Sequence, residues 1–117
     1  MTTIDSEQLS YAVDVFGVSR VETVSNSAFK ELCYIFSKVR EGVAEDGRAE
    51  LADQIHSIMN STTALGAIKL SQSIADFENQ LRRDDANVTS QVDKVEIDAL
   101  AADKELCFLL ADIRKSH

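Results

Sequence analysis

Apolar residues recur at intervals of three and four along most of this chain, and that spacing predicts amphipathic helices. The pattern resolves into one short segment and four longer ones, separated by glycines or by short polar stretches. We therefore expect helices over residues 6–16, 25–43, 48–65, 67–83 and 88–113. Ser6 is a candidate N-cap for the first helix, and Gly17 ends that helix.

The longest regular repeat lies in the last segment, where apolar positions alternate steps of four and three throughout. These positions are Val88, Val92, Val95, Ala99, Ala102, Leu106, Leu109 and Ile113. Such a repeat is typical of a helix that is buried along one stripe against other helices. A two-stranded coiled coil is an alternative use of this stripe, but the other three long helices also carry apolar stripes that need burial.

Four amphipathic helices joined by short loops predict an antiparallel bundle with up-down-up-down topology. The short first helix is expected to lie across one end of the bundle. A chain of 117 residues suits one domain, so we assign residues 1–117 to a single helical bundle. The absence of proline and the presence of only four glycines favour the same all-α class, because sheet-rich folds need more special turns.

Net charge and cysteine usage narrow the range of partners. The formal charge of −8 makes nucleic acid and anionic membrane surfaces poor partners, because both attract clustered lysine and arginine. No apolar run approaches the roughly 18–20 residues that a bilayer requires, and no signal-peptide pattern opens the chain. Cys33 and Cys107 form no C-x-x-C pair, and we expect them to be reduced core residues of a cytoplasmic protein.

His56 is a residue that packing alone does not explain. The apolar stripe of its helix consists of Leu51, Ile55, Ile58, Thr62 and Leu65. At about 100° per residue, His56 lies roughly 140° away from the centre of that stripe and therefore faces solvent. Its neighbours Ala49, Ala52 and Thr63 are small, so we expect the imidazole to be accessible.

Several explanations of an exposed histidine compete. The simplest is a solvated side chain without a role. Asp53 is a possible metal-ligand partner three residues earlier, but no second histidine or cysteine accompanies the pair, so no metal site is expected. No catalytic serine–histidine–aspartate set can be argued from the sequence, and the four scattered glycines form no phosphate-binding loop.

The segment HSIMNSTTALG, residues 56–66, resembles the phosphoacceptor region of histidine-containing phosphotransfer (HPt) domains, the intermediate carriers of bacterial phosphorelays. In that family a hydrophobic residue follows the histidine by two positions, small residues come next, and a glycine follows by ten. The matching positions here are His56, Ile58, Ser61, Gly66, Ala67, Lys69 and Leu70. The likeness extends over the whole chain, because the family fold is a four-helix bundle with a short helix packed at one end.

The resemblance implies that His56 accepts a phosphoryl group from the aspartate of a response-regulator receiver domain and later returns it. A neutral imidazole offers one ring nitrogen as a nucleophile, which suits this chemistry. The receiver would supply an acidic pocket and Mg²⁺, so we expect no cofactor on this chain and no enzymatic activity of its own. The implied partners are a receiver domain and a sensor histidine kinase, and the protein is expected to act as a cytoplasmic monomer.

This chain departs from the family pattern at Met59, where a lysine that helps to hold the phosphoryl group is usual. Lys69 matches a position that is often basic in the family, so it is the expected substitute, with Asn60 as a second phosphate-supporting residue. Gly66 is expected to turn the chain sharply between the third and fourth helices in a left-handed conformation.

Receiver domains present an apolar patch beside their acidic pocket, so a matching docking surface is expected around His56. Its predicted members are Ala49, Ala52, Met59 and Thr63, with Leu9 and Val13 of the first helix as an extension. Two other interpretations stay open. One is a degenerate HPt-like module that binds a receiver or kinase without carrying phosphate, which Met59 favours, and the other is an unrelated helical-bundle adaptor.

Overall fold

The structure is a computed structural model that describes residues 4–42, 45–83 and 88–116. Within these ranges the chain is helical and contains no strand, which confirms the all-α class. Its helices, in chain order, are α1 (Ser6–Phe16), α2 (Val18–Glu41), α3 (Glu45–Ala64), α4 (Ile68–Arg82) and α5 (Val88–Ser116). None of these described helices combines the length and the apolar character that crossing a bilayer requires.

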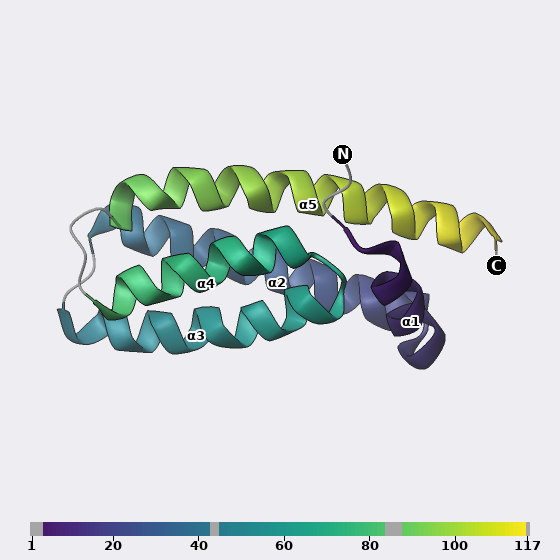
Figure 1. Ribbon diagram of the computed structural model, residues 1–117, viewed down its shortest axis with the longest axis horizontal. Coiled ribbons are helices and arrows are strands. Elements are labelled where there is room, and N and C mark those ends of the chain that lie inside the picture. Colours follow the sequence, from purple (N-terminus) through teal and green to yellow (C-terminus); the bar gives the residue numbers. More distant parts are fainter. Residues whose placement is uncertain (1–3, 43–44, 84–87, 117) are drawn as a thin grey trace.

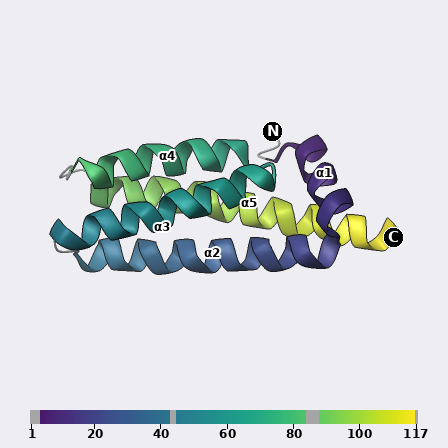
Figure 2. The ribbon, with the colours of Figure 1, turned by 90° about the horizontal axis from the view of Figure 1, so that it is seen from below.

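The four longer helices lie side by side along the long axis of the molecule, and α1 lies near one end (Figure 1; Figure 2). Contacts join α2 to α3, α3 to α4, α4 to α5 and α5 back to α2, so these helices form a closed ring. Within the described ranges α3 and α5 are not in contact, because they occupy opposite corners of that ring. The short helix α1 packs against α2 and α3.

The predicted apolar stripes form the core between these helices. The stripe of α3 is buried at all its predicted positions, from Leu51 to Leu65. The stripe of α5 is buried from Val88 to Leu106, and beyond that point the fully buried position is Leu110 rather than the predicted Leu109. Burial of these apolar side chains is the main force that holds the helices together.

The sequence pattern places the start of α2 at residue 25, but the helix begins at Val18, directly after Gly17. Val21, Ser25 and Ala28 are buried and extend the α2 stripe towards its N-terminus. Polar residues between these positions dilute the periodicity, which explains the late predicted start. The other predicted boundaries agree with the structure to within three residues, except that residue 43 lies outside the described ranges.

Two further expectations are wrong. Asp5, not Ser6, caps α1, because the Asp5 carboxylate accepts hydrogen bonds from two backbone N–H groups of the first turn. Cys33 and Cys107 are free thiols, but both are exposed rather than part of the core. Each directly follows a core leucine in its helix and therefore lies about 100° away from that leucine around the helix axis.

The turn between α3 and α4 is tied to the start of the chain. Gly66 has a φ of +87°, the left-handed region expected for it. Its carbonyl oxygen accepts a hydrogen bond of 2.8 Å from the backbone N–H of Asp5. A Cβ atom on Gly66 would lie 2.5 Å from the carbonyl oxygen of Asp5, so only glycine fits at this position. The turn thus sets both the register of α3 against α4 and the position of the segment that leads into α1.

Candidate functional site

Three of the polar side-chain pairs that connect α3 to α4 show how the two helices are aligned. The pairs are Thr62 with Ser71, His56 with Glu78, and Asp53 with Arg82. Each step towards the N-terminus of α3, from Thr62 to His56 to Asp53, is matched by a step of nearly the same number of residues towards the C-terminus of α4. This register is that of an antiparallel hairpin closed by the Gly66 turn, and it places the middle of α4 beside His56.

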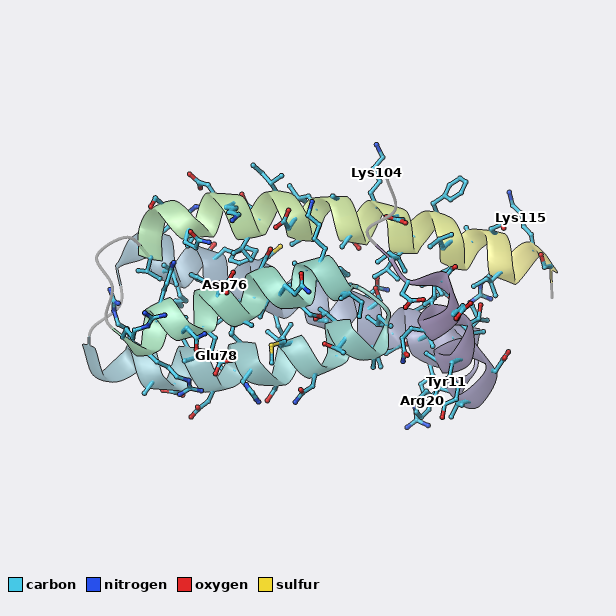
Figure 3. All side chains as sticks on the ribbon, viewed as in Figure 1. Tyr11, Arg20, Asp76, Glu78, Lys104 and Lys115 are labelled. Atoms are coloured by element: carbon cyan, nitrogen blue, oxygen red, sulfur yellow. The ribbon has the colours of Figure 1, made fainter. Side chains whose placement is uncertain are left out.

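His56 lies on the open side of this pair of helices, with its side chain 53% exposed. Its Nδ1 atom is 2.9 Å from Oε1 of Glu78, whose own side chain is only 11% exposed. Among the described residues, Glu78 is the one charged residue that is buried. Figure 3 shows Glu78 on α4 at the side that faces α3.

The Glu78 carboxylate is kept ionised despite its burial. Burial raises the pKa of Glu78, but the hydrogen bonds from His56 and Arg82 outweigh it, and the net pKa is lowered. Nε of Arg82 donates to Oε2 of Glu78 at 2.8 Å, and Nη2 of Arg82 donates to Asp53 at 2.8 Å. The hydrogen bonds to Asp53 and Glu78 in turn raise the pKa of Arg82.

This arrangement selects one tautomer of the neutral imidazole. An ionised carboxylate can only accept hydrogen bonds, so Nδ1 of His56 must carry the proton that it donates to Glu78. The other ring nitrogen, Nε2, then has a free lone pair. A carboxylate that orients a histidine in this way is a recurrent means of preparing the opposite nitrogen for attack or for ligand binding.

The predicted docking residues fall into two groups. Ala49 and Thr63 are exposed, and Met59 is half-buried against the core, so these three can contribute to a surface beside His56. Ala52 is fully buried, and its inclusion in the docking surface is wrong. The wheel of a single helix does not reveal which neighbouring helix covers this position.

The predicted extension of the docking surface onto α1 is also wrong, because Leu9 and Val13 are both buried. The exposed apolar residues of α1 are instead Tyr11, Val15 and Phe16. Any partner that contacts α1 would meet these three side chains.

The two predicted phosphate-supporting residues differ in position. Asn60 is exposed on α3, one helical turn after His56 and on the same side of the helix. Lys69 is exposed in the first turn of α4, nine residues before Glu78. At 1.5 Å per residue that separation is about 13 Å along the helix axis. Lys69 therefore does not lie beside His56, and its expected role as substitute for the usual lysine does not fit the structure.

Glu78 and Arg82 are the site residues that the sequence analysis missed. Their spacing of four residues places them on one face of α4, and that spacing is visible in the sequence. What the sequence pattern lacks is the register of α4 against α3. With the turn at Gly66 and Ala67, counting eleven residues outward from Ala67 in both directions brings Glu78 opposite His56.

Among the described residues, no group of three or more histidine, cysteine, aspartate and glutamate side chains is arranged to hold a metal ion. Comparisons with protein families, with characterised proteins and with solved structures give no match for this chain. The functional interpretation of His56 therefore rests on the geometry of the site and on the sequence resemblance.

Proposed function

We propose that this chain is a histidine-containing phosphotransfer domain, a phosphorelay carrier in which His56 is the phosphoacceptor. In this proposal α2 to α5 are the antiparallel, up-down-up-down four-helix bundle of that family, and α1 is its additional N-terminal helix. The observation that carries the proposal is the half-exposed imidazole held at Nδ1 by the buried Glu78 carboxylate. Burying an ionised carboxylate is costly. A solvated surface histidine without a role does not require such a partner.

The proposed reaction transfers a phosphoryl group from an aspartyl phosphate to a ring nitrogen. The Nε2 lone pair of His56 attacks phosphorus, the N–P bond forms as the P–O bond breaks, and the receiver's aspartate leaves as a carboxylate. Nδ1 keeps its proton, so the imidazole ring gains a positive charge. The Glu78 carboxylate, 2.9 Å from Nδ1, stabilises that charge. In the return step the attacking aspartate breaks the N–P bond and the ring becomes neutral again.

The partner supplies the rest of the chemistry in this proposal. A receiver domain contributes the acidic pocket, the Mg²⁺ ion and a lysine, while a sensor histidine kinase provides phosphate upstream. The carrier then needs no bound cofactor and no kinase activity, which accounts for a site with one nucleophile and one orienting carboxylate. The exposed polar residues beside His56, such as Asn60 and Thr63, leave room for a receiver to approach. Both partners act in the cytoplasm.

Met59 favours a second candidate, a degenerate module that binds a receiver without accepting phosphate. The side chain at this position is half-buried against the core and carries no charge that could help to hold a phosphoryl group. Arg82 is the cation nearest to His56 through the hydrogen-bond network, but Asp53 and Glu78 already bind it. The two candidates differ in one observable, the formation of phosphohistidine.

The test is phosphoryl transfer from radiolabelled, phosphorylated receiver domains. We expect an acid-labile, base-stable label on the parent protein and on the His117→Gln control, and no label on His56→Gln. Circular dichroism checks that the variants remain helical. Label that survives in His56→Gln would contradict the assignment of the acceptor. Stable receiver binding without any label would instead identify the degenerate module.

A further inference from the structure

The outer face of α5 carries three of the four most exposed large apolar side chains of the described part of the chain. Phe108 is 73% exposed, Ile97 is 67% exposed and Leu100 is 61% exposed. They lie three, eight and eleven residues apart, so they share one side of the helix. Ala101 and Lys104 are exposed between them.

This stripe lies opposite the core stripe of α5. At about 100° per residue, the centre of the outer stripe lies roughly 180° from Val95 and Leu106, which are fully buried. Figure 3 shows Lys104 and Lys115 pointing away from the other helices on this side of α5. The helix contacts α2 and α4, and no other described helix covers its outer face.

We propose that the outer face of α5 is a dimerisation surface that binds the same face of a second copy in antiparallel orientation. A two-fold symmetric interface requires a surface that is complementary to itself. The two most exposed side chains of the stripe meet this requirement about a point between Ala102 and Asp103. Ile97 lies five residues before Ala102, and Phe108 lies five residues after Asp103. Antiparallel pairing therefore places Ile97 of each copy against Phe108 of the other.

The charges along the stripe select the antiparallel orientation. About the same point, Lys104 of one copy meets Ala101 of the other, where its aliphatic stem can cover apolar surface. Lys94 lies beside Asp112 of the second copy, on the same flank of the interface, and the symmetry repeats this pair. Parallel pairing would instead bring Lys104 against its own counterpart and would leave Lys94 far from Asp112 of the second copy, which is unfavourable.

The geometry leaves the His56 face free. The ring of contacts places α3 and α5 at opposite corners, so a copy bound to α5 does not cover the imidazole. The interface is only one helix wide and falls near or below about 1,200 Å² of buried surface, the size typical of weak complexes. We therefore expect a dimer that dissociates on dilution. This inference replaces the monomer expected from the sequence, and it does not depend on the proposed phosphotransfer.

The first test compares two phenylalanine substitutions by sedimentation velocity over a wide range of protein concentration. Phe108→Glu removes a central apolar contact and is expected to weaken dimerisation at least tenfold. Phe16→Glu is the matched control, because Phe16 is 56% exposed on α1, away from the proposed interface. It should dimerise like the parent. A parent protein that is monomeric throughout, or a Phe108→Glu variant that dimerises equally well, would overturn the proposal.

The second test examines orientation through Lys94 and Asp112. In antiparallel pairing, Lys94→Glu and Asp112→Lys each turn two attractive pairs into repulsive ones and should weaken self-association about fivefold. An equimolar mixture of the two variants restores opposite charges and should recover the affinity of the parent. Single variants that associate as strongly as the parent would contradict antiparallel pairing about this point.

Discussion

Two faces of this molecule, the α3–α4 face around His56 and the outer face of α5, are organised in opposite ways. On the first, the imidazole of His56 is held by a hydrogen bond to a buried carboxylate and, through it, to an arginine. On the second, large apolar side chains stand exposed with no described helix over them. The first face fixes the orientation of one group, and the second offers contact area.

This difference indicates how a small bundle can separate two tasks. Accurate placement of an imidazole needs buried polar partners, and these are stable only where neighbouring helices satisfy every hydrogen bond. Association with another protein surface needs apolar area, which belongs on a helix face that the core does not use. Because α3 and α5 occupy opposite corners of the ring, a change on one face should leave the other intact.

The largest expected effect distinguishes buried from exposed alanine on α3. Ala52→Glu places a carboxylate at a fully buried position and should lower the free energy of unfolding by at least about 3 kcal/mol. Ala49→Glu, at an exposed position of the same helix, should change it by less than about 0.5 kcal/mol. Urea denaturation measures both. If Ala49→Glu also weakens phosphoryl transfer several-fold, the docking surface lies on this face; unchanged transfer would place it elsewhere.

The next largest effect concerns the turn that fixes the α3–α4 register. Gly66→Val should cost about 2–4 kcal/mol, because it combines backbone strain at positive φ with a clash against the Asp5 carbonyl. Gly42→Val is the matched control, since Gly42 has a φ of +88° but an open surrounding, and it should cost about 1 kcal/mol. If both variants lose the same free energy of unfolding in denaturant titrations, the contact with Asp5 does not contribute to stability.

Glu78 allows a direct comparison of carboxylates on one helix. Glu78→Gln removes the charge beside Nδ1 of His56 and should slow transfer roughly tenfold, because the positive ring in the transition state loses its partner. Asp76→Asn alters an exposed carboxylate two residues away and should leave the rate unchanged. Nitrogen-15 NMR of the ring should show less of the Nδ1–H tautomer in Glu78→Gln only. Equal rates in the two variants would remove Glu78 from the mechanism.

The smallest expected effects concern lysine side chains that could help to hold a phosphoryl group on His56. Met59→Lys introduces an ammonium one helical turn from His56 and should shift the phosphoryl equilibrium several-fold towards this protein. Lys69→Ala should have no effect, because Lys69 lies about 13 Å from Glu78 along the axis of α4, towards its N-terminus. Equilibrium measurements at fixed Mg²⁺ test both. A clear shift in Lys69→Ala would restore the role that the sequence suggested for this lysine.

Much of the fold follows from the sequence, because the period of apolar residues in a helix is a local property. The stripe of α3 and the outward direction of His56 could be predicted in this way. The burial of Ala52 could not be predicted, because it depends on how the neighbouring helices pack and not on the apolar pattern of α3 itself. The Glu78–Arg82 part of the site was missed for the same reason, since it appears only when the Gly66 turn sets α4 against α3. Interhelical register is what the pattern of a single helix does not contain.

One measurement tests directly whether His56 carries phosphate on Nε2, the ring nitrogen opposite Glu78. Phosphorus-31 and nitrogen-15 NMR of the phosphorylated, isotope-labelled protein identify both the modified residue and the modified ring atom. We predict a phosphorus–nitrogen coupling to Nε2 of His56, with Nδ1 still protonated and hydrogen-bonded to Glu78. Phosphorus on Nδ1, phosphorus on another residue, or no phosphohistidine after incubation with phosphorylated receivers would contradict it.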